Sequence, residues 1–372
     1  MAAKKRRRRK RGGDPRTRGI ILGILILVAV LIGVLIYFGI GANQGEESLE
    51  ESDSGMAAAD RALSGPVNPL TGEAGFDAEK LGVRPVAIMI NNAPAARPQW
   101  GLCSPDIVFE GVVEGGATRM MWVYADVNDI PKVGSVRSAR HDFVELAEGM
   151  DAQFVHWGGS DLAYDAMSVR GVDDIDGIAH EGRYFFRDHS RDVAIEHRGY
   201  TTGEDIAKAI RELDRRTELD PDCSKPFAFA APDGLRTLSG GPCQSVSFDF
   251  SSVSSYSHTF NYDAQERLYY NRIGGVPMCQ DGGEQMAVTN VLLLYCTVRN
   301  TGDSAGHMEM SLTSGSGLYI SNGTYESIRW EKGDPSDPLK LETTDGTELV
   351  LNVGKSYIGF VPTSEVESVT IS

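Results

Sequence analysis

Short apolar runs alternate with amphipathic periodic segments through the first half of the region beyond the N-terminal 66 residues. The apolar runs predict four buried strands, at 86–90, 107–113, 120–124 and 154–157. Helices are predicted behind Ser138 and Ser160, because apolar residues at helical spacing follow a residue type that favours helix N-termini. A capping box at 201–204 predicts another helix. Strands alternating with helices predict an α/β domain over residues 67–218.

The pattern changes after residues 218–226, a segment rich in acids, proline and cysteine. Val246, Phe248 and Phe250 alternate with polar residues, and 291–295 is an uninterrupted apolar strand. Asn-Gly at 322–323 and Asp-Gly at 345–346 supply the positive φ angles of tight hairpins. About eight strands predict an all-β domain, a sandwich or barrel, over residues 225–372. Each domain is expected to form its own core, with a protease-sensitive boundary between them.

An uncharged apolar run at 19–42 is preceded by the basic segment 1–18, which includes Lys4 to Arg11. About 20 helical residues span a bilayer core, so this run predicts a single transmembrane helix, with a cleaved signal peptide as the alternative. Basic residues remain in the cytoplasm, which places the N-terminus inside and the C-terminal domains outside the plasma membrane. A basic run beside such a span is a topology signal rather than a nucleic-acid site.

Residues 43–66 are small, acidic and aperiodic, which predicts a flexible linker between membrane and fold. Beyond residue 42 the chain has 26 basic and 51 acidic residues, a net charge of −25. That charge favours solubility and disfavours binding of polyanions over the general surface. Any anionic ligand needs a local basic site.

All five cysteines follow the predicted span, and none precedes Cys103, which excludes an N-terminal lipoprotein anchor. Export permits disulfides. Cys223 with Cys243 and Cys279 with Cys296 are the pairings considered, and buried thiols are the alternative. No Cys-x-x-Cys pair occurs, and the seven histidines lack a regular ligand spacing, so neither a metal site nor a cofactor is predicted.

Polar residues concentrate between positions 91 and 140, several of them at the ends of predicted strands, where α/β sheets bind ligands. The ligand-binding candidates are Asn91, Asn92, Arg97, Glu114, Arg119, Arg137, Ser138 and Arg140, and Asp106 is the candidate metal ligand or base. Arg119, Arg137 and Arg140 form a predicted clamp for phosphate or carboxylate. In the alternative interpretation these arginines pair with Asp106, Glu110 and Glu114 in a structural network.

A second polar cluster runs from Arg187 to Arg191, and Glu196 and His197 follow it. Its side chains have the chemistry of acids and bases, although a histidine among charged residues is more often structural. No nucleophile elbow, phosphate loop or zinc-protease motif occurs. The sequence therefore leaves open whether the protein is an enzyme.

Five blocks resemble the DUF3048 family of YerB-like exported proteins from Gram-positive bacteria: 84–92, 96–99, 106–110, 113–119 and 133–140. The Glu-Gly-Gly-Ala-Thr-Arg and Val-Arg-Ser-Ala-Arg motifs are the most specific of them. The resemblance extends over residues 67–365 and implies an exported α/β domain followed by a β domain, of no established activity. The chain departs from family members in its helical anchor and in Glu196-His197-Arg198, where members often carry Pro-His-Asn.

A weaker likeness joins the order of Val86–Ile90, Asp106 and Arg137 to the LytR-CpsA-Psr phosphotransferases, although Ser138 stands where that family has aspartate. Two functions follow as hypotheses. The first is an envelope protein that binds a partner protein or an anionic cell-wall or lipid-phosphate component. The second is an enzyme acting on lipid-linked or cell-wall phosphates, in which the three arginines and Asp106 converge on one pocket.

Overall fold

The computed structural model describes residues 65–223, 227–231 and 234–372. Residues 64–372 form one compact unit. The predicted tail (1–18), membrane span (19–42) and all but the end of the linker (43–66) lie outside the described residues. Within the part of the chain that is described, no helix has the length and apolar character needed to cross a membrane.

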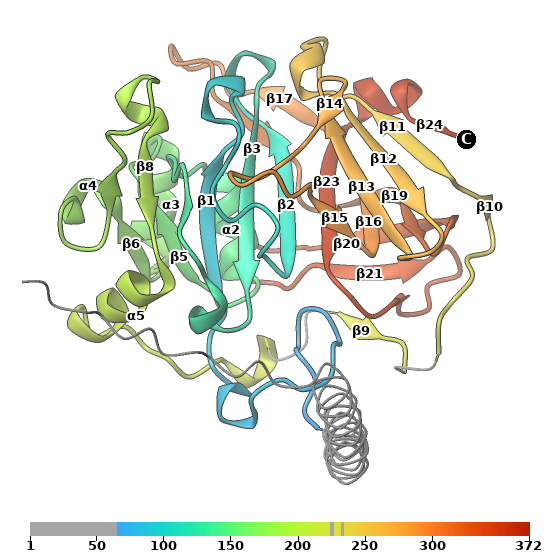
Figure 1. Cartoon of the computed structure of the whole chain (residues 1–372), viewed down its shortest axis with the longest axis horizontal. Helices are drawn as coiled ribbons and strands as arrows, with labels where there is room; N and C mark the ends of the chain where they lie inside the picture. Colours follow the sequence, from blue (N-terminus) through green and yellow to red (C-terminus); the bar gives the residue numbers. More distant parts are fainter. Residues whose placement is uncertain (1–64, 224–226, 232–233) are drawn as a thin grey trace, which may run out of the picture. The chain divides into compact units, whose positions relative to one another are not determined.

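One mixed sheet of eleven strands carries segments from both halves of the chain (Figure 1). In spatial order its strands are β10 (Gly241–Pro242), β20 (Thr324–Glu331), β19 (Ser314–Ser321), β16 (Asn290–Cys296), β23 (Ser356–Pro362), β2 (Ile107–Val112), β3 (Thr118–Tyr124), β1 (Val86–Asn91), β5 (Gln153–His156) and β6 (Asp174–Asp176), with β21 (Lys340–Thr343) beside β20. Strands β1, β2, β5, β6, β16 and β23 all run in the same direction.

The two halves meet at β23, a C-terminal strand that lies between β2 and β16 (Figure 1). Ser356 is paired with Ile107 on one side and with Asn290 on the other, and both pairings are parallel. The N-terminal half is thus mixed α/β and the C-terminal half is rich in strands. The predicted boundary at 218–226 is not a boundary within the sheet.

A second sheet of six strands belongs to the C-terminal half alone. It contains β14 (Val276–Pro277), β13 (Leu268–Ile273), β12 (His258–Asp263), β11 (Ser245–Phe248), β24 (Thr370–Ile371) and β15 (Ala287–Val288). Three smaller sheets complete the strands: β17 (Val298–Asn300) with β18 (Met308–Met310), β22 (Val350–Leu351) with β9 (Ala228–Phe229), and β4 (Val133–Gly134) with β8 (Gly199–Thr201) and β7 (Phe186–Arg187). The expected sandwich is present only in part, because one of its two sheets continues into the α/β half.

The described helices are α2 (His141–Glu148), α3 (Asp161–Arg170), α4 (Gly177–His180) and α5 (Gly203–Glu212). Ser160 caps α3 as predicted, since its side chain accepts a hydrogen bond from Ala163 N. Ser138 does not cap α2, which begins three residues later, behind Arg140. The cap of α5 is Thr202, one residue beyond the predicted Thr201.

Alternate residues of the central strands enter two hydrophobic cores, one on each face of the large sheet. On one face Met89 and Phe109 of the sheet pack with Phe143 of α2 and Met167 of α3. On the other face Ile88, Trp122 and Leu293 pack with α5 and with Phe248 and Phe260 of the second sheet. Both cores contain residues from both halves and none before Leu70, so the fragment 65–372 contains the whole described fold.

All five cysteines are free thiols. The considered pairings of Cys223 with Cys243 and of Cys279 with Cys296 are therefore not made. Cys243 and Cys296 are buried, and burial raises the pKa of each thiol, to about 11 and about 12. For Cys296 the buried-thiol alternative is the correct one.

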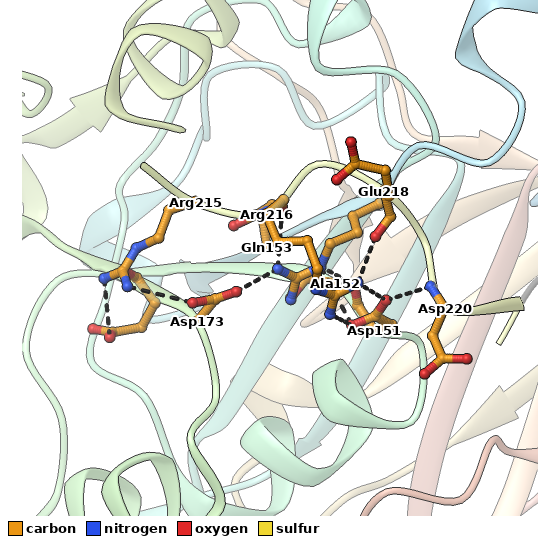
Figure 2. Close-up of polar contacts among 10 residues, drawn as sticks. Asp151, Ala152, Gln153, Asp173, Arg215, Arg216, Glu218 and Asp220 are labelled. Atoms are coloured by element: carbon orange, nitrogen blue, oxygen red, sulfur yellow. Dashed lines mark hydrogen bonds and ion pairs between the residues drawn. The ribbon is translucent and has the colours of Figure 1, made fainter. Parts of the chain in front are cut away.

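The segment that links the two halves is tied to the amino edge of the central sheet (Figure 2). Arg216 donates two hydrogen bonds to the carboxylate of Asp151, and Asp220 N donates to the same carboxylate at 2.8 Å. Arg84, which is 5 % exposed, donates to the Arg216 carbonyl at 3.3 Å and to Asp173 Oδ2 at 2.6 Å. These contacts anchor the chain up to Asp220 before it enters the C-terminal half.

Candidate functional site

The carboxyl ends of four parallel strands, β1, β2, β5 and β6, lie along one edge of the central sheet. The antiparallel strand β3 begins at this edge, because Thr118 pairs with Val112 at the end of β2. Ligands of α/β sheets bind outside such an edge. Every predicted site residue except Asp106 lies on or beside it.

Asn92 and Arg97 belong to a buried structural network at the end of β1. Asn92 Nδ2 donates to Glu110 Oε1 at 2.7 Å and to Thr118 Oγ1 at 2.8 Å. Arg97 donates to the Asn92 carbonyl at 2.7 Å and to the Ser255 carbonyl at 2.9 Å. These donors have their partners inside the protein, so we assign both residues to the scaffold.

Glu110, at the centre of that network, joins the two halves of the molecule. Its carboxylate accepts hydrogen bonds from Tyr357 at 2.9 Å and from Thr118, and lies 3.3 Å from His258 Nε2. Desolvation alone would raise the pKa of Glu110, but the charge and hydrogen bond of His258 and the bonds from Thr118 and Tyr357 hold it below its ordinary value. Tyr357 and His258 both come from the C-terminal half.

Arg140 is paired with Glu114 in a bidentate ion pair. Its Nε donates to Oε1 at 2.5 Å and its Nη2 to Oε2 at 2.8 Å. Desolvation opposes ionisation of Glu114, but the bonds and charge of Arg140 lower the pKa of that carboxyl. For this arginine the structural-network interpretation applies.

Arg119 is buried, at 8 % exposure, without a carboxylate partner. Its Nη1 donates to the Ser138 carbonyl at 2.6 Å, while its Nε has no hydrogen-bond partner among the described residues. Desolvation, together with the positive charges of Arg140 and Arg137, lowers the pKa of Arg119 to about 9, although Glu114 opposes the shift. A nearby anion would relieve this electrostatic cost.

Arg137 is held by backbone bonds between the ends of β1 and β5. Its N–H donates to the Met89 carbonyl and its carbonyl accepts from Trp157 N. In the described structure its guanidinium has no hydrogen-bond or ion-pair partner, and its Nε is buried. Desolvation lowers the pKa of Arg137, and the charge of Glu196 opposes that shift without contacting the guanidinium.

Arg137 and Ser138 line a pocket of about 440 Å³. Its walls come from the turn 157–159 before α3, from Tyr164 on α3, from Ile178 on α4 and from the segment 187–199. The Cζ atom of Arg187 lies 4.4 Å from the centroid of the Trp157 ring, which forms part of the floor. The pocket lining therefore includes the Trp157 ring and the guanidinium of Arg137, which has no partner among the described residues. The guanidinium over that ring belongs to Arg187, which is paired with Glu181.

Asp106 is not part of this site. It precedes β2, and the whole length of β2 separates it from Arg119, since Ile107 pairs with Val123 and Val112 with Thr118. Its two carboxylate oxygens accept hydrogen bonds from Asn68 Nδ2 at 3.0 Å and from Ala125 N at 2.7 Å. Burial raises its pKa to about 6, but the predicted convergence with the three arginines does not occur.

The segment 187–197 contributes more to the site than the sequence suggested. Arg187, Ile195 and Glu196 line the Arg137 pocket, and His197 Nδ1 lies 2.8 Å from Asn91 Nδ2. The polar cluster was visible in the sequence. Its position was not, because nothing local shows that a loop a hundred residues beyond β1 returns to the end of that strand.

A neighbouring pair of pockets was not predicted at all. They measure about 540 and 430 Å³ and lie where α2 and α3 meet the β17–β18 hairpin. His141, Arg299 and Glu309 line both pockets. His307 from the same hairpin lies 3.8 Å from Glu114, which links these pockets to the arginine cluster.

The opposite, amino edge of the sheet provides a contrast. Figure 2 shows Arg215 and Arg216 directed at carboxylates, with Arg215 3.4 Å from Asp173 and Arg216 2.6 Å from Asp151. Arg84, Arg140, Arg215 and Arg216 are thus matched with acids, and Arg97 of the scaffold donates to backbone carbonyls instead. Arg119 and Arg137 have no acid partner among the described residues. The part of the chain that the structure describes contains no cluster of three or more histidine, cysteine or acidic side chains arranged to hold a metal.

Comparisons with known proteins place the chain in a family. Residues 70–216 match "Protein of unknown function (DUF3048) N-terminal domain", and residues 246–358 match the C-terminal domain of the same family. A Bacillus subtilis (strain 168) protein described as "Putative lipoprotein YerB" is 30% identical over 292 residues, covering 77% of this chain and 84% of the relative. The crystal structure of YerB from Bacillus subtilis superposes with a TM-score of 0.71 at 27% identity, covering 82% of this chain and 99% of that one. With both domains matched and the fold shared, the chain belongs to the DUF3048 family.

Proposed function

We propose that this protein is a membrane-anchored extracytoplasmic protein that binds an anionic component of the cell envelope in the Arg137 pocket. The helix predicted at 19–42 is its anchor, with the N-terminus in the cytoplasm and the domains outside the cell. The similar Bacillus protein is described as a lipoprotein. In this chain the apolar run at 19–42 takes the place of the lipid.

The observation that carries the proposal is the guanidinium of Arg137. It lies in a region of the chain with a net charge of −25, yet no carboxylate contacts it among the described residues. The arginines assigned to the scaffold have partners for their guanidinium groups: Arg84, Arg140 and Arg216 pair with acids, and Arg97 donates to backbone carbonyls. An unmatched guanidinium in a pocket is suited to a ligand that brings its own negative charge.

Two further features support an anionic ligand at this position. Arg119, without an acid partner, donates to the carbonyl of Ser138, which lines the pocket. The ten-residue helix α3 begins at Asp161, two residues after Gly159 in the pocket wall, and helix N-termini favour negative charge. Phosphate and carboxylate groups share the oxygen geometry that a guanidinium binds.

The binding proposal is tested by titration calorimetry of the fragment 65–372 with inorganic phosphate and glycerol phosphate. We expect Arg137→Ala to weaken binding by about 1.5–3 kcal/mol, the worth of a charge-assisted hydrogen bond. Arg329→Ala is the matched control, because Arg329 is exposed on β20 and its substitution removes the same charge far from the pocket lining. Equal losses in the two variants would show that only net charge matters.

The topology proposal has a separate test. Protease treatment of intact cells should remove residues 43–372 and leave the basic segment protected. A chain that becomes accessible only after lysis would contradict an external location.

An enzyme acting on lipid-linked or cell-wall phosphates is the alternative carried by sequence analogy. It requires a base other than Asp106, which lies at the opposite edge of the sheet. A partner protein as the ligand is the remaining alternative, and it predicts no binding of the small phosphates.

A further inference from the structure

Exposed apolar side chains gather around the Arg137 pocket. Tyr164, Ile178 and Ile195 line it and are 38%, 65% and 58% exposed. Leu162 and Val169 of α3, at 37% and 85% exposure, line the neighbouring pocket on the other side of that helix. Half of the ten large apolar side chains that are this exposed in the described structure thus border two adjacent pockets.

This arrangement differs from the scatter expected of ordinary surface residues. Single exposed apolar side chains are normal, whereas a group of them around a polar pocket marks a binding surface. The Trp157 ring, which also lines the pocket, packs closely against the backbone because Gly177 and Gly199 have no side chains. A Cβ atom at either glycine would lie within 2.8 Å of that ring.

We infer that the ligand of this pocket is an amphiphilic phosphate, a lipid phosphate monoester or diphosphate whose head group contacts Arg137 and whose hydrocarbon chain lies on Ile178, Ile195 and Tyr164. The inference rests on the proposed anion-binding function and names its substrate class. Charge complementarity assigns the head group to the guanidinium. The apolar rim has no role for a small wall phosphate or sugar phosphate, but it provides contact area for methylene groups.

The occupant is one lipid molecule in the pocket rather than an anionic membrane surface. The basis is that Arg119 is buried and Arg137 is half-buried, and a single phosphate can reach a pocket where a bilayer surface cannot. Acids also border the site, with Glu196 in the wall and Glu181 bonded to Arg187 at 2.6 Å. Such acids disfavour general attraction to a negatively charged surface.

The test compares three probes on the fragment 65–372: octyl phosphate below its micelle concentration, inorganic phosphate, and octanol. Each buried methylene adds about fourfold in affinity, so octyl phosphate is expected to bind at least tenfold tighter than inorganic phosphate. Octanol is expected to bind at least tenfold more weakly than octyl phosphate. Arg137→Ala should weaken the binding of both octyl phosphate and inorganic phosphate.

Ile178→Ser with Ile195→Ser should bring octyl phosphate to within about threefold of inorganic phosphate and leave inorganic phosphate unchanged. Val276→Ser, at a 59% exposed position on β14, is the matched control and should change neither. A thermal melt establishes that each variant is folded.

Equal affinities for octyl phosphate and inorganic phosphate overturn the inference that the ligand is amphiphilic, but remain consistent with an anion-binding site. Failure of both phosphates overturns the proposed function itself. Equal recruitment to vesicles of phosphatidylcholine containing either phosphatidic acid or phosphatidylserine, matched in charge, indicates a membrane surface and also overturns the inference. Preference for phosphatidic acid supports it.

Discussion

Arg137 and Arg140 are three positions apart, yet their guanidinium groups have opposite surroundings. Arg140 is 12% exposed in its side chain and holds both oxygens of Glu114. Arg137 has no acid partner in the described structure. The two residues therefore separate a role in stability from a role in binding.

We predict that Arg140→Ala lowers the free energy of unfolding by about 1–3 kcal/mol, because it leaves a partly buried carboxylate without its donors. Arg137→Ala should change stability by less than about 0.5 kcal/mol, the range of substitutions that remove no contact. Urea denaturation of the fragment 65–372 measures both. Comparable losses for the two variants would argue that Arg137 also holds the fold.

Asp106 provides a prediction about pH. Burial raises its pKa to about 6 from an ordinary value near 4, so the folded state binds this proton more tightly than the unfolded state. Its contribution to stability is complete below pH 4 and is lost as the pH rises through 6.

The asparagine of the Asp106→Asn variant cannot ionise. The free energy of unfolding of this variant, relative to that of the wild type, should therefore rise by roughly 2–3 kcal/mol between pH 4 and pH 7.5. The measurement is urea denaturation of both proteins at the two pH values. A difference that does not change with pH would show that the folded and unfolded states ionise Asp106 alike.

At the scale of single elements, α3 lies between the Arg137 pocket and the neighbouring pocket that Leu162 and Val169 line. Its first turn is fixed by Ser160, which is buried and whose hydroxyl accepts from Ala163 N at 3.2 Å. Ser160→Ala should destabilise the fold by about 1 kcal/mol, the usual cost of a lost cap.

Ser168→Ala, at an exposed position in the last turn of the same helix, is the matched control, and it should be neutral or slightly stabilising because alanine favours helices. Thermal unfolding of the two variants measures the difference. Equal effects would mean that packing rather than the cap sets the start of α3.

The elements that sequence predicted well have a strong local cause. The apolar runs gave β1, β2, β3, β5 and β16 within two residues, and Asn322-Gly323 marks the hairpin between β19 and β20, with φ angles of 50° and 68°. The start of α2 was misplaced because Ser138 is a good cap residue by type, whereas here its carbonyl accepts from Arg119 and its hydroxyl donates to Trp157 O at 3.2 Å.

What the sequence could not show is which distant segments meet. Most of the predicted site residues lie on one edge because β1 and β2 both end there and the antiparallel strand β3 begins there. Asp106 lies outside the site because it precedes β2, whereas Arg119 lies beside the other end of that strand. Residues 187–197 belong to the site because the chain returns to the end of β1 about a hundred residues later. Neither leaves a periodic signal.

At the scale of the whole molecule, the position of β23 bears on whether the two halves can fold independently. It is buried along its full length, and Tyr357 on it donates to Glu110 across the joint. Independent folding of residues 67–218 and 225–372 stays a prediction of the sequence, and the structure argues for the opposite outcome.

We therefore predict that residues 65–218 expressed alone are aggregated or lack a cooperative melt, because β2 would present an unpaired, apolar edge. Co-expression with residues 219–372 should restore a soluble complex that elutes with the intact fragment in size-exclusion chromatography. A monomeric, cooperatively unfolding 65–218 would overturn this prediction and support two independent domains.

The position of β23 also has a consequence for biogenesis. Tyr357 and Glu110 are 247 residues apart in sequence, and the central sheet cannot close until the last strand has been delivered. Loop closure over such separations slows folding. If the chain is translocated from its N-terminus, the first-exported half must wait with one edge of β2 unpaired. That edge is exposed to quality-control proteases and to the same segment of neighbouring chains. A nonsense mutation before or within β23 (Ser356–Pro362) is then expected to abolish the protein rather than shorten it. Export chaperones should matter more for its yield than the net stability of the finished fold suggests.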